Sequence, residues 1–152
     1  MSTIVEPRWL TAEQQVTWRT YLSAVARITE RLDSELRPFG LDLGEYEILV
    51  HLSESEGQQL RMSDLANKVR QSRSRLTHTV SRMEGKGLSL RKSCPEDRRG
   101  VIAVLTGRGL TLLKSAAPYH VQSVRDVFID VVDPDDFRAL GRAMKAVLAV
   151  TN

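Results

Sequence analysis

Two short runs of apolar residues, separated by a polar turn, restrict the fold of this 152-residue chain more than any other feature. The first run repeats at the spacing of one helix face, at Leu65, Ala66 and Val69. The second run follows the turn and repeats at spacings of four and three, at Leu76, Val80 and Met83. This pattern predicts two short helices joined by a tight turn.

The residues around the second helix predict where it starts and ends. Ser72 suits the N-cap, because its hydroxyl can accept a hydrogen bond from an early backbone amide that has no partner within the helix. Gly87 suits the position after the helix, where a left-handed backbone ends it. We therefore expect this helix to run from about Arg73 to Lys86.

The face of this helix opposite its apolar stripe is polar. The residues on and beside that face form a candidate DNA-binding surface: Ser72, Arg73, Ser74, Arg75, Thr77, His78, Ser81 and Arg82. Arginine can bind guanine through two hydrogen bonds, and Ser and Thr can donate or accept, so the composition suits a major groove. An ordinary solvated helix face has the same polarity and is the alternative interpretation.

A β-hairpin is predicted directly after this helix. Residues 88–92 and 101–105 alternate or are continuously apolar, and the charged residues 93–100 between them are expected to form a long loop that Pro95 and Gly100 delimit. We refer to this hairpin as the wing.

Arginines dominate the predicted tip of the wing. Asp97 is placed to pair with Arg99, which would hold one guanidinium while Arg98 or Arg99 projects. An arginine on a thin loop suits a narrow minor groove, whose negative potential attracts it. The candidate wing residues are Arg91, Lys92, Asp97, Arg98 and Arg99. A solvated hairpin tip with a weak surface ion pair is the alternative.

The order of these motifs resembles the multiple antibiotic resistance regulator (MarR) family of bacterial transcription factors. Three stretches carry the resemblance: residues 82–88 (RMEGKGL), 97–100 (DRRG) and 104–109 (VLTGRG). It extends over nearly the whole chain, because the flanking helical segments also fit in order and length. It implies a mainly α fold with a small β-hairpin wing, namely a winged helix-turn-helix with N- and C-terminal dimerisation helices. Most members with this fold act as repressors.

Upstream of the central unit, the chain is predicted to be helical after a loose arm at residues 1–10. Thr11 and Gln14 have the pattern of a capping box and begin a long amphipathic helix. Asp42 begins a second helix by the same logic. A short strand near residues 60–62 could join the wing as a third strand.

Downstream, Thr106 is expected to cap a long helix. Pro118 lies inside that helix and should remove one backbone hydrogen bond and bend the axis near Lys114. Asp133 and Pro134 then end it and begin the last helix, as N-cap and first helical residue.

The whole chain, residues 1–152, is interpreted as one MarR-like domain with two lobes. Residues 42–106 form the winged-helix DNA-binding lobe, and residues 11–36 and 107–150 form a helical dimerisation lobe. The terminal helices carry more apolar surface than one winged helix can cover, although part of each stripe will belong to the core of its own chain. We therefore expect a homodimer that binds a pseudo-palindromic operator in double-stranded DNA, with recognition helices about 34–36 Å apart.

Positive charge is concentrated in the central unit. From Arg61 to Gly100 there are eleven Lys and Arg residues and four acids, a net charge of +7, whereas the whole chain has +3 and the remainder therefore −4. Such a concentration is typical of a site for a polyanion. A membrane surface would also attract it, but the apolar stripe of the recognition helix is too narrow for an interfacial anchor.

The composition is that of an ordinary globular domain, with 41% hydrophobic and 27% charged residues. Neither a membrane span nor a secretory signal is predicted, so we expect a cytoplasmic protein. The single cysteine, Cys94, cannot form an internal disulfide, which fits a reducing compartment. Lys92 could activate this thiol, but oxidation-sensing members of the family carry their cysteine near the N-terminus, where this chain has none.

No catalytic constellation is predicted. The histidines His51, His78 and His120 form no metal-binding motif, and a single cysteine cannot supply a zinc site with sulfur ligands, which leaves only a zinc site shared across a dimer. Dinucleotide-binding, P-loop and GxSxG motifs are missing from the sequence. We therefore expect no enzymatic activity, no metal and no cofactor.

The resemblance also implies a small aromatic effector. Many relatives bind aromatic or phenolic acids between the DNA-binding and dimerisation lobes and then release DNA. The candidate pocket residues on helices that would line this crevice are Trp18, Tyr21, Tyr46 and His51, with Arg19 or Arg27 as partners for an acid. Packing within the core is the alternative role for these side chains.

Two functions of different classes fit the sequence. The first is a sequence-specific, homodimeric, DNA-binding transcriptional regulator, a repressor that a small aromatic ligand relieves. The second is a winged-helix interaction module whose basic face binds an acidic protein or structured RNA. Salt-dependent binding to duplex DNA, with preference for one sequence over competitor DNA, separates them.

Overall fold

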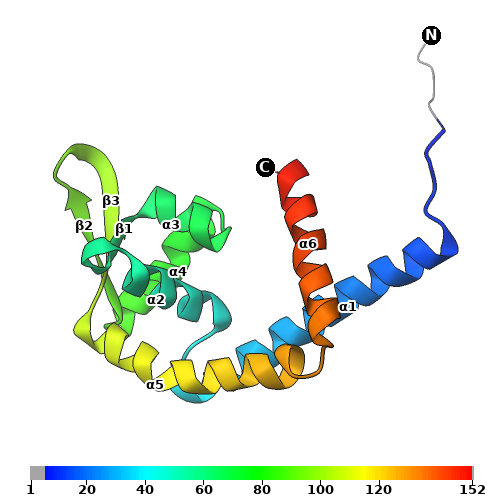
Figure 1. The fold of residues 1–152 in the computed structure, drawn as a ribbon. Helices are drawn as coiled ribbons and strands as arrows, with labels where there is room; N and C mark the ends of the chain where they lie inside the picture. Colours follow the sequence, from blue (N-terminus) through cyan, green and yellow to red (C-terminus); the bar gives the residue numbers. More distant parts are fainter. Residues whose placement is uncertain (1–5, 152) are drawn as a thin grey trace, which may run out of the picture.

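The computed structural model describes residues 6–151 and is mainly helical, with one three-stranded antiparallel sheet (Figure 1). Its longer helices are α1 (Ala12–Leu36), α2 (Leu43–Glu54), α3 (Met62–Val69), α4 (Arg73–Gly85), α5 (Gly107–Val124) and α6 (Pro134–Val150). Its strands are β1 (Gln59–Arg61), β2 (Ser89–Cys94) and β3 (Asp97–Leu105), and short helical turns are η1 (Arg37–Phe39), η2 (Glu56–Gln58) and η3 (Arg125–Ile129). The predicted fold class, a winged helix-turn-helix with additional helices, is confirmed. Within residues 6–151, none of the helices is long and apolar enough to cross a membrane.

The predicted capping residues begin the helices. Thr11 and Gln14 form a reciprocal capping box, in which each side chain accepts a hydrogen bond from the other residue's backbone amide. Asp42 begins α2 with a second capping box, and Thr106 caps α5. These caps fix the starts of the helices because they satisfy amides that have no partner within the helix.

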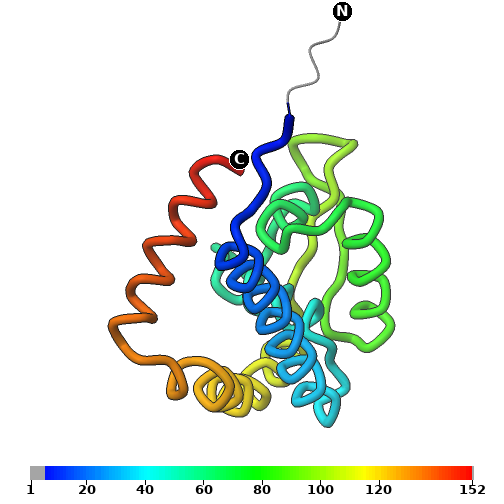
Figure 2. The backbone as a smooth tube through the Cα atoms, turned by 90° about the vertical axis from the view of Figure 1, so that its right-hand side faces the viewer, coloured from blue at the N-terminus to red at the C-terminus, as the bar shows by residue number. Residues whose placement is uncertain are grey.

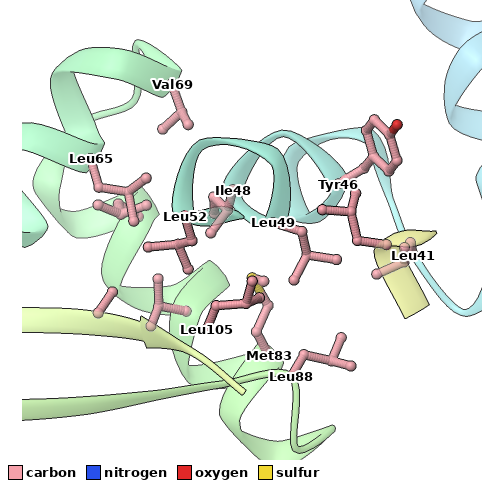
Figure 3. Packing of buried hydrophobic residues seen from close by; sticks show 14 of the residues in the cluster. Leu41, Tyr46, Ile48, Leu49, Leu52, Leu65, Val69, Met83, Leu88 and Leu105 are labelled. Atoms are coloured by element: carbon pink, nitrogen blue, oxygen red, sulfur yellow. The ribbon is translucent and has the colours of Figure 1, made fainter. Parts of the chain in front are cut away.

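Helix α2 lies at the centre of the core and contacts α1, α3, α4, α5, β1 and β3. Its fully buried apolar residues are Ile48, Leu49 and Leu52. Around it pack buried side chains from α3, α4 and the sheet (Figure 3), among them Leu65, Val69, Met83, Leu88 and Leu105. The inward stripe predicted for α4 is buried here, so the opposite face of α4 points outward.

The sheet has the order β1-β3-β2. The predicted third strand is β1, which pairs antiparallel with β3, with Leu60 opposite Ala103. The two wing strands are longer than predicted. Most of residues 93–100, expected as loop, lies within strands β2 and β3, and only Pro95 and Glu96 form the turn between them. A charged two-stranded ribbon can extend into solvent because its backbone groups hydrogen-bond to each other.

The C-terminal half is interrupted at a place that was not predicted. α5 continues through Pro118 to Val124, and the single helix expected up to residue 133 is interrupted instead by the π-helical turn η3. In that turn the Asp130 amide bonds to the Arg125 carbonyl, five residues earlier. Asp133 then caps α6 as predicted.

The start of α5 is fixed to the segment that follows α4. The Thr106 hydroxyl donates to the Gly87 carbonyl at 2.7 Å, and the Thr106 amide donates to the Leu88 carbonyl at 3.2 Å. A Cβ on Gly109 would lie 2.2 Å from the Leu88 carbonyl oxygen, so only glycine permits this close approach. The end of α4, the base of the wing and the start of α5 therefore meet in one tightly packed junction.

Helix α6 and the first half of α1 extend away from the packed body (Figure 1), and α6 also stands apart in the turned view (Figure 2). No residue of α6 is buried by the rest of the described chain, residues 6–151. Large apolar side chains on α6, on α1 and just before α1 are exposed: Trp9, Val16, Trp18, Leu22, Val25, Val147, Leu148 and Val150. Of the arm expected over residues 1–10, residues 6–10 are non-helical and the first five lie outside the described residues.

Candidate nucleic-acid interface

Helix α3, a short turn and helix α4 form a helix-turn-helix unit. The turn begins at Arg70, whose φ of 53° is left-handed. Ser72 caps α4 as predicted, because its hydroxyl accepts from the Arg75 amide at 3.2 Å. The helix ends at Gly85, one residue earlier than expected, and Gly87 follows with a φ of 74°. The amides of Gly87 and of the next residue bond back to the last turn of α4, which is a Schellman ending.

The outward face of α4 is exposed, as predicted for Arg73, Ser74, Arg75, Thr77, His78, Ser81 and Arg82. Thr79 was not part of the predicted inward stripe, but it is buried and its hydroxyl donates to the Arg75 carbonyl. Four side chains of the outward face form neither a hydrogen bond nor an ion pair with any residue of the described chain: Arg73, Ser74, Arg75 and His78. They are therefore free to meet a ligand.

Arg82, in contrast, is bound within the chain. Its guanidinium pairs with Asp42 at 3.1 Å and approaches Glu45 at 3.7 Å. One helical turn later, Lys86 donates to both carboxylate oxygens of Glu45 at 2.8 and 3.0 Å, and to the Gly40 carbonyl at 2.8 Å. Glu45 is only 1% exposed, so these bonds satisfy a buried carboxylate. This set of contacts, which we call the α2–α4 clasp, fastens the end of α4 to the start of α2.

Arg91, predicted as a wing contact for DNA, fastens the wing to the other flank of α4. It donates to both carboxylate oxygens of Glu84 at 2.8 and 3.0 Å, and to the Ser81 hydroxyl at 3.1 Å. The hydrogen bond to Glu84 raises the pKa of Arg91 above its ordinary value. Arg91 and Ser81 therefore orient the wing relative to α4.

The wing is irregular at its arginines. Ser93 pairs with Val101, but the next residue, Cys94, pairs with Asp97, so residues 98–100 have no partner on β2. These three residues form a bulge, and its two arginines are exposed. Bulges redirect side chains away from the regular alternation of a strand.

Asp97 supports this bulge in a way that differs from the prediction. Its carboxylate accepts a hydrogen bond from the backbone amide of Arg99 at 3.0 Å, and its other oxygen lies 3.9 Å from the guanidinium of Arg61. The expected pair between the side chains of Asp97 and Arg99 is not formed, because a short Asp side chain reaches the amide two residues ahead more easily. The guanidinium groups of Arg98 and Arg99 stay exposed, as does Lys92.

Cys94 is packed inside the wing. It is 6% exposed, and its Cβ lies only 2.9 Å from where a Cβ on Gly100 would be. Burial removes the solvent access that reactive thiols need. Elsewhere in residues 6–151, no three His, Cys, Asp or Glu side chains gather into a group that could hold a metal ion.

The residues predicted for a ligand pocket lie in two separate places. Tyr46 and His51 line a cavity of about 480 Å³ between α1, α2 and α5, to which His120 also contributes. Trp18 and Tyr21 stack on each other along α1, with ring centroids 5.9 Å apart, and do not line that cavity. The four predicted residues therefore do not form one site, because Trp18 and Tyr21 lie in the part of α1 that extends beyond the body.

His120 supplies the unsatisfied polar group of this cavity. Its ring lies 4.3 Å from that of Tyr46, and its Nδ1 is buried without a hydrogen-bond partner among the described residues. Burial lowers the pKa of His120, so the ring is neutral at pH 7, and burial raises the pKa of Tyr46. The cations that line the cavity are Lys68 and Arg70, beside the acid Glu47, whereas Arg19 and Arg27 line a different cavity beside η3.

Sequence reasoning missed several contributors to these sites. Glu45 and Lys86 were predicted only as parts of helix ends, although Arg82 and Lys86 are one helical turn apart and could have indicated a shared acidic partner. Arg61 was also missed, although the predicted third strand near residues 60–62 would place its side chain beside the wing. No sequence pattern distinguishes His120 from other residues of the long helix.

Comparison with known proteins identifies transcriptional regulators. Residues 41–101 match the model of the MarR family. The structure of AbsC, a MarR family transcriptional regulator from Streptomyces coelicolor, is 49% identical, with a TM-score of 0.90 over 94% of this chain and 97% of AbsC. That of Sco3205 from the same organism, in complex with DNA, is 42% identical, with a TM-score of 0.90 over 93% of this chain and 90% of Sco3205. The HTH-type transcriptional regulator MhqR of Bacillus subtilis (strain 168) is 27% identical over 124 residues, 82% of this chain and 83% of MhqR.

The α2–α4 clasp can be tested by a double-mutant cycle. We expect Lys86→Ala to lower the free energy of unfolding by about 1–3 kcal/mol, because a buried carboxylate loses its closest cation. The same change in a Glu45→Gln background should cost less, since glutamine still accepts from the Asp42 amide and needs no counter-charge. Urea unfolding of the four proteins at one protein concentration measures the coupling. Equal costs in both backgrounds would show that the two side chains do not interact.

Proposed function

Because the chain belongs to the MarR family of transcriptional regulators, we propose that it is a homodimer that binds double-stranded DNA sequence-specifically and represses transcription. The outward face of α4 carries this proposal. Arg73, Ser74 and Arg75 are exposed there without a partner in the described chain, on a helix that is fastened along both flanks. The relative Sco3205 forms a complex with DNA, which supports the same role here.

In this proposal α4 enters the major groove. Residues near the N-terminus of a recognition helix contact base edges, so Arg73, Arg75 and Thr77 are placed to do so. The Thr77 hydroxyl donates to the Arg73 carbonyl at 2.8 Å and keeps its acceptor positions for a base. Ser72 contributes by capping α4 and so fixing where the helix begins. Arg82, because it is bound to α2, acts by positioning the helix.

The wing enters the adjacent minor groove through the bulge at residues 98–100. Since Asp97 binds a backbone amide, both Arg98 and Arg99 keep a free guanidinium for the groove, and Lys92 is exposed for phosphate contact. Arg91 sets the angle of the wing through Glu84.

The homodimer follows from the uncovered apolar surface of α1 and α6. Trp18 and Leu148 are 53% and 61% exposed within one chain, although large apolar side chains in stripes of this length are normally buried. A second copy of residues 11–36 and 107–150 would cover them through a two-fold axis. The two α4 helices would then face successive major grooves and require a pseudo-palindromic operator.

A small aromatic effector is the remaining part of the proposal. The cavity of Tyr46, His51 and His120 offers an aromatic wall, an unsatisfied ring nitrogen and two cations for an acid, Lys68 and Arg70, which outnumber its one carboxylate, Glu47. It lies between α5 and the helix-turn-helix unit, so a ligand there can favour one spacing of the recognition helices.

If the chain is a homodimer, a charge placed in the interface should dissociate it. In sedimentation at micromolar concentration, we expect twice the 17.1 kDa mass of one chain. Leu148→Glu should give monomers because it puts a charge into the proposed interface. The matched control is Leu90→Glu, which changes an exposed leucine of the wing and should leave the dimer intact. A monomeric wild-type chain would contradict the proposal.

The proposed DNA contacts predict a graded loss of affinity. With a duplex selected from a random pool, we expect Arg73→Ala, and Arg99→Ala or Arg98→Ala in the wing, to weaken binding by about 1–3 kcal/mol. Fluorescence anisotropy against competitor DNA measures this. Arg142→Ala removes the same charge from exposed α6 and should have little effect. Unchanged affinity in both wing variants would exclude the minor-groove contact, and no preference for any duplex would favour an acidic protein or structured RNA as partner.

The effector cavity predicts a ligand-dependent thermal shift. We expect one or more hydroxybenzoic acids to raise the unfolding temperature and to lower DNA affinity. His120→Phe should abolish the shift, because it keeps a ring against Tyr46 but removes the unpaired nitrogen. Tyr119→Phe alters the neighbouring exposed ring and is the control. Ligand binding that leaves DNA affinity unchanged would remove the regulatory role.

A further inference from the structure

A cationic cavity lies where the wing meets the helix-turn-helix unit. Its volume is about 490 Å³, and its lining includes Arg61 at the end of β1, Arg73 at the start of α4, and Asp97 and Arg99 of the wing. We call this cavity the wing notch. Arg91 also lines it, but its guanidinium is bound to α4.

Charge in the wing notch is not balanced. Asp97 is the only carboxylate among the described residues that line it. Arg61 lies 3.9 Å from this carboxylate, and the two side chains are 41% and 50% exposed, so the pair is weak and open to a competing anion. Arg73 and Arg99 have no acidic partner within residues 6–151. Three guanidinium groups therefore line the notch with one carboxylate, and only Arg61 lies near it.

The backbone around Arg61 holds this side chain at the notch. Arg61 lies opposite Ile102 of β3 in the sheet, and it is also the residue before α3. A Cβ on Gly100 would come within 3.6 Å of the Arg61 guanidinium, so the bulge of the wing passes close beside it. Arg61 thus contacts the sheet, the helix-turn-helix unit and the wing. These three parts must keep fixed positions relative to one another when DNA is bound.

We propose that the wing notch binds one backbone phosphate of duplex DNA, with Arg61 as its principal ligand. The inference rests on the proposed DNA-binding function and adds a contact outside α4 and the tip of the wing. The guanidinium group of Arg61 can bind two phosphate oxygens at once, and the positive charges of Arg73 and Arg99, which line the same notch, add attraction while their side chains contact the grooves. Such a contact fixes the position of the protein without reading sequence.

Asp97 has a defined part in this arrangement. In the free protein its carboxylate holds Arg61 beside the notch, and it also accepts from the Arg99 amide. The phosphate displaces the Asp97 carboxylate from Arg61 and leaves the bond to the Arg99 amide in place. Arg61 thereby links the position of the DNA backbone on the protein to the position of the wing.

The salt dependence of DNA binding tests the proposal. Each phosphate contact contributes about 0.9 to the slope of log affinity against log salt, so Arg61→Gln should reduce the slope by about 0.9 for each protomer. The loss of affinity should be the same for a selected duplex and for unrelated duplexes. Arg61→Lys keeps the charge and should retain the slope. The control Arg142→Gln removes one charge from α6 and should leave slope and affinity unchanged.

Asp97→Asn separates a phosphate contact from a purely structural role. Asparagine still accepts from the Arg99 amide but no longer competes for Arg61, so binding should be as strong as in wild type or stronger. Equal losses of DNA affinity in Arg61→Gln and Asp97→Asn, with wild-type salt slopes, would mean that Arg61 only supports the wing and would overturn the proposal. An Arg61→Gln protein with the same affinity and slope as Arg142→Gln would also overturn it. If wild type binds no duplex, the proposed function itself fails; if only the Arg61 result fails, the wing notch alone is refuted.

Discussion

The buried carboxylate of Glu45 ties helix α4 to the start of α2, because it bonds both to Lys86 at the end of α4 and to the Asp42 amide. It has left water, so it must keep Lys86 and the Asp42 amide as partners, and a rotation of α4 about its axis would leave a charge unpaired in the core. On the other flank, the pair of Arg91 with Glu84 restrains the wing in the same way. The outward side chains can remain unpaired because the flanks hold the helix.

The orientation of α4 is passed on to the long helices through backbone contacts. The segment after α4 bonds to Thr106, and Gly109 lets α5 lie so close to the Leu88 carbonyl that a Cβ there would come within 2.2 Å of its oxygen. Backbone and side-chain hydrogen bonds thus tie the start of α5 to the segment that ends α4. In the proposed homodimer, the packing of α1, α5 and α6 between two chains would set the distance between the two recognition helices.

The sequence predicts the features that neighbouring residues determine, such as helix caps. It does not predict which partner a long charged side chain binds when several are possible. Ser72, Gly87 and Thr106 were placed correctly because a cap involves only neighbouring residues. Arg82 and Arg91 are on the predicted exposed surfaces, yet both are bound within the chain, since their acidic partners, Asp42 and Glu84, meet them only after folding. The interruption at η3 was not predicted, because no residue type marks it.

The candidate ligand cavity shows how such a junction could be regulated. His120 belongs to α5, Tyr46 to α2, and Arg70 to the turn before α4, so the cavity changes shape whenever α5 moves relative to the helix-turn-helix unit. The buried Nδ1 of His120 lacks a partner, and burying a polar atom unpaired is unfavourable. A ligand that bonds to it stabilises only those arrangements in which α5 keeps that distance. A ligand shifts DNA affinity only through such a preference, and the coupling is reciprocal, so operator DNA must weaken the ligand by the same factor.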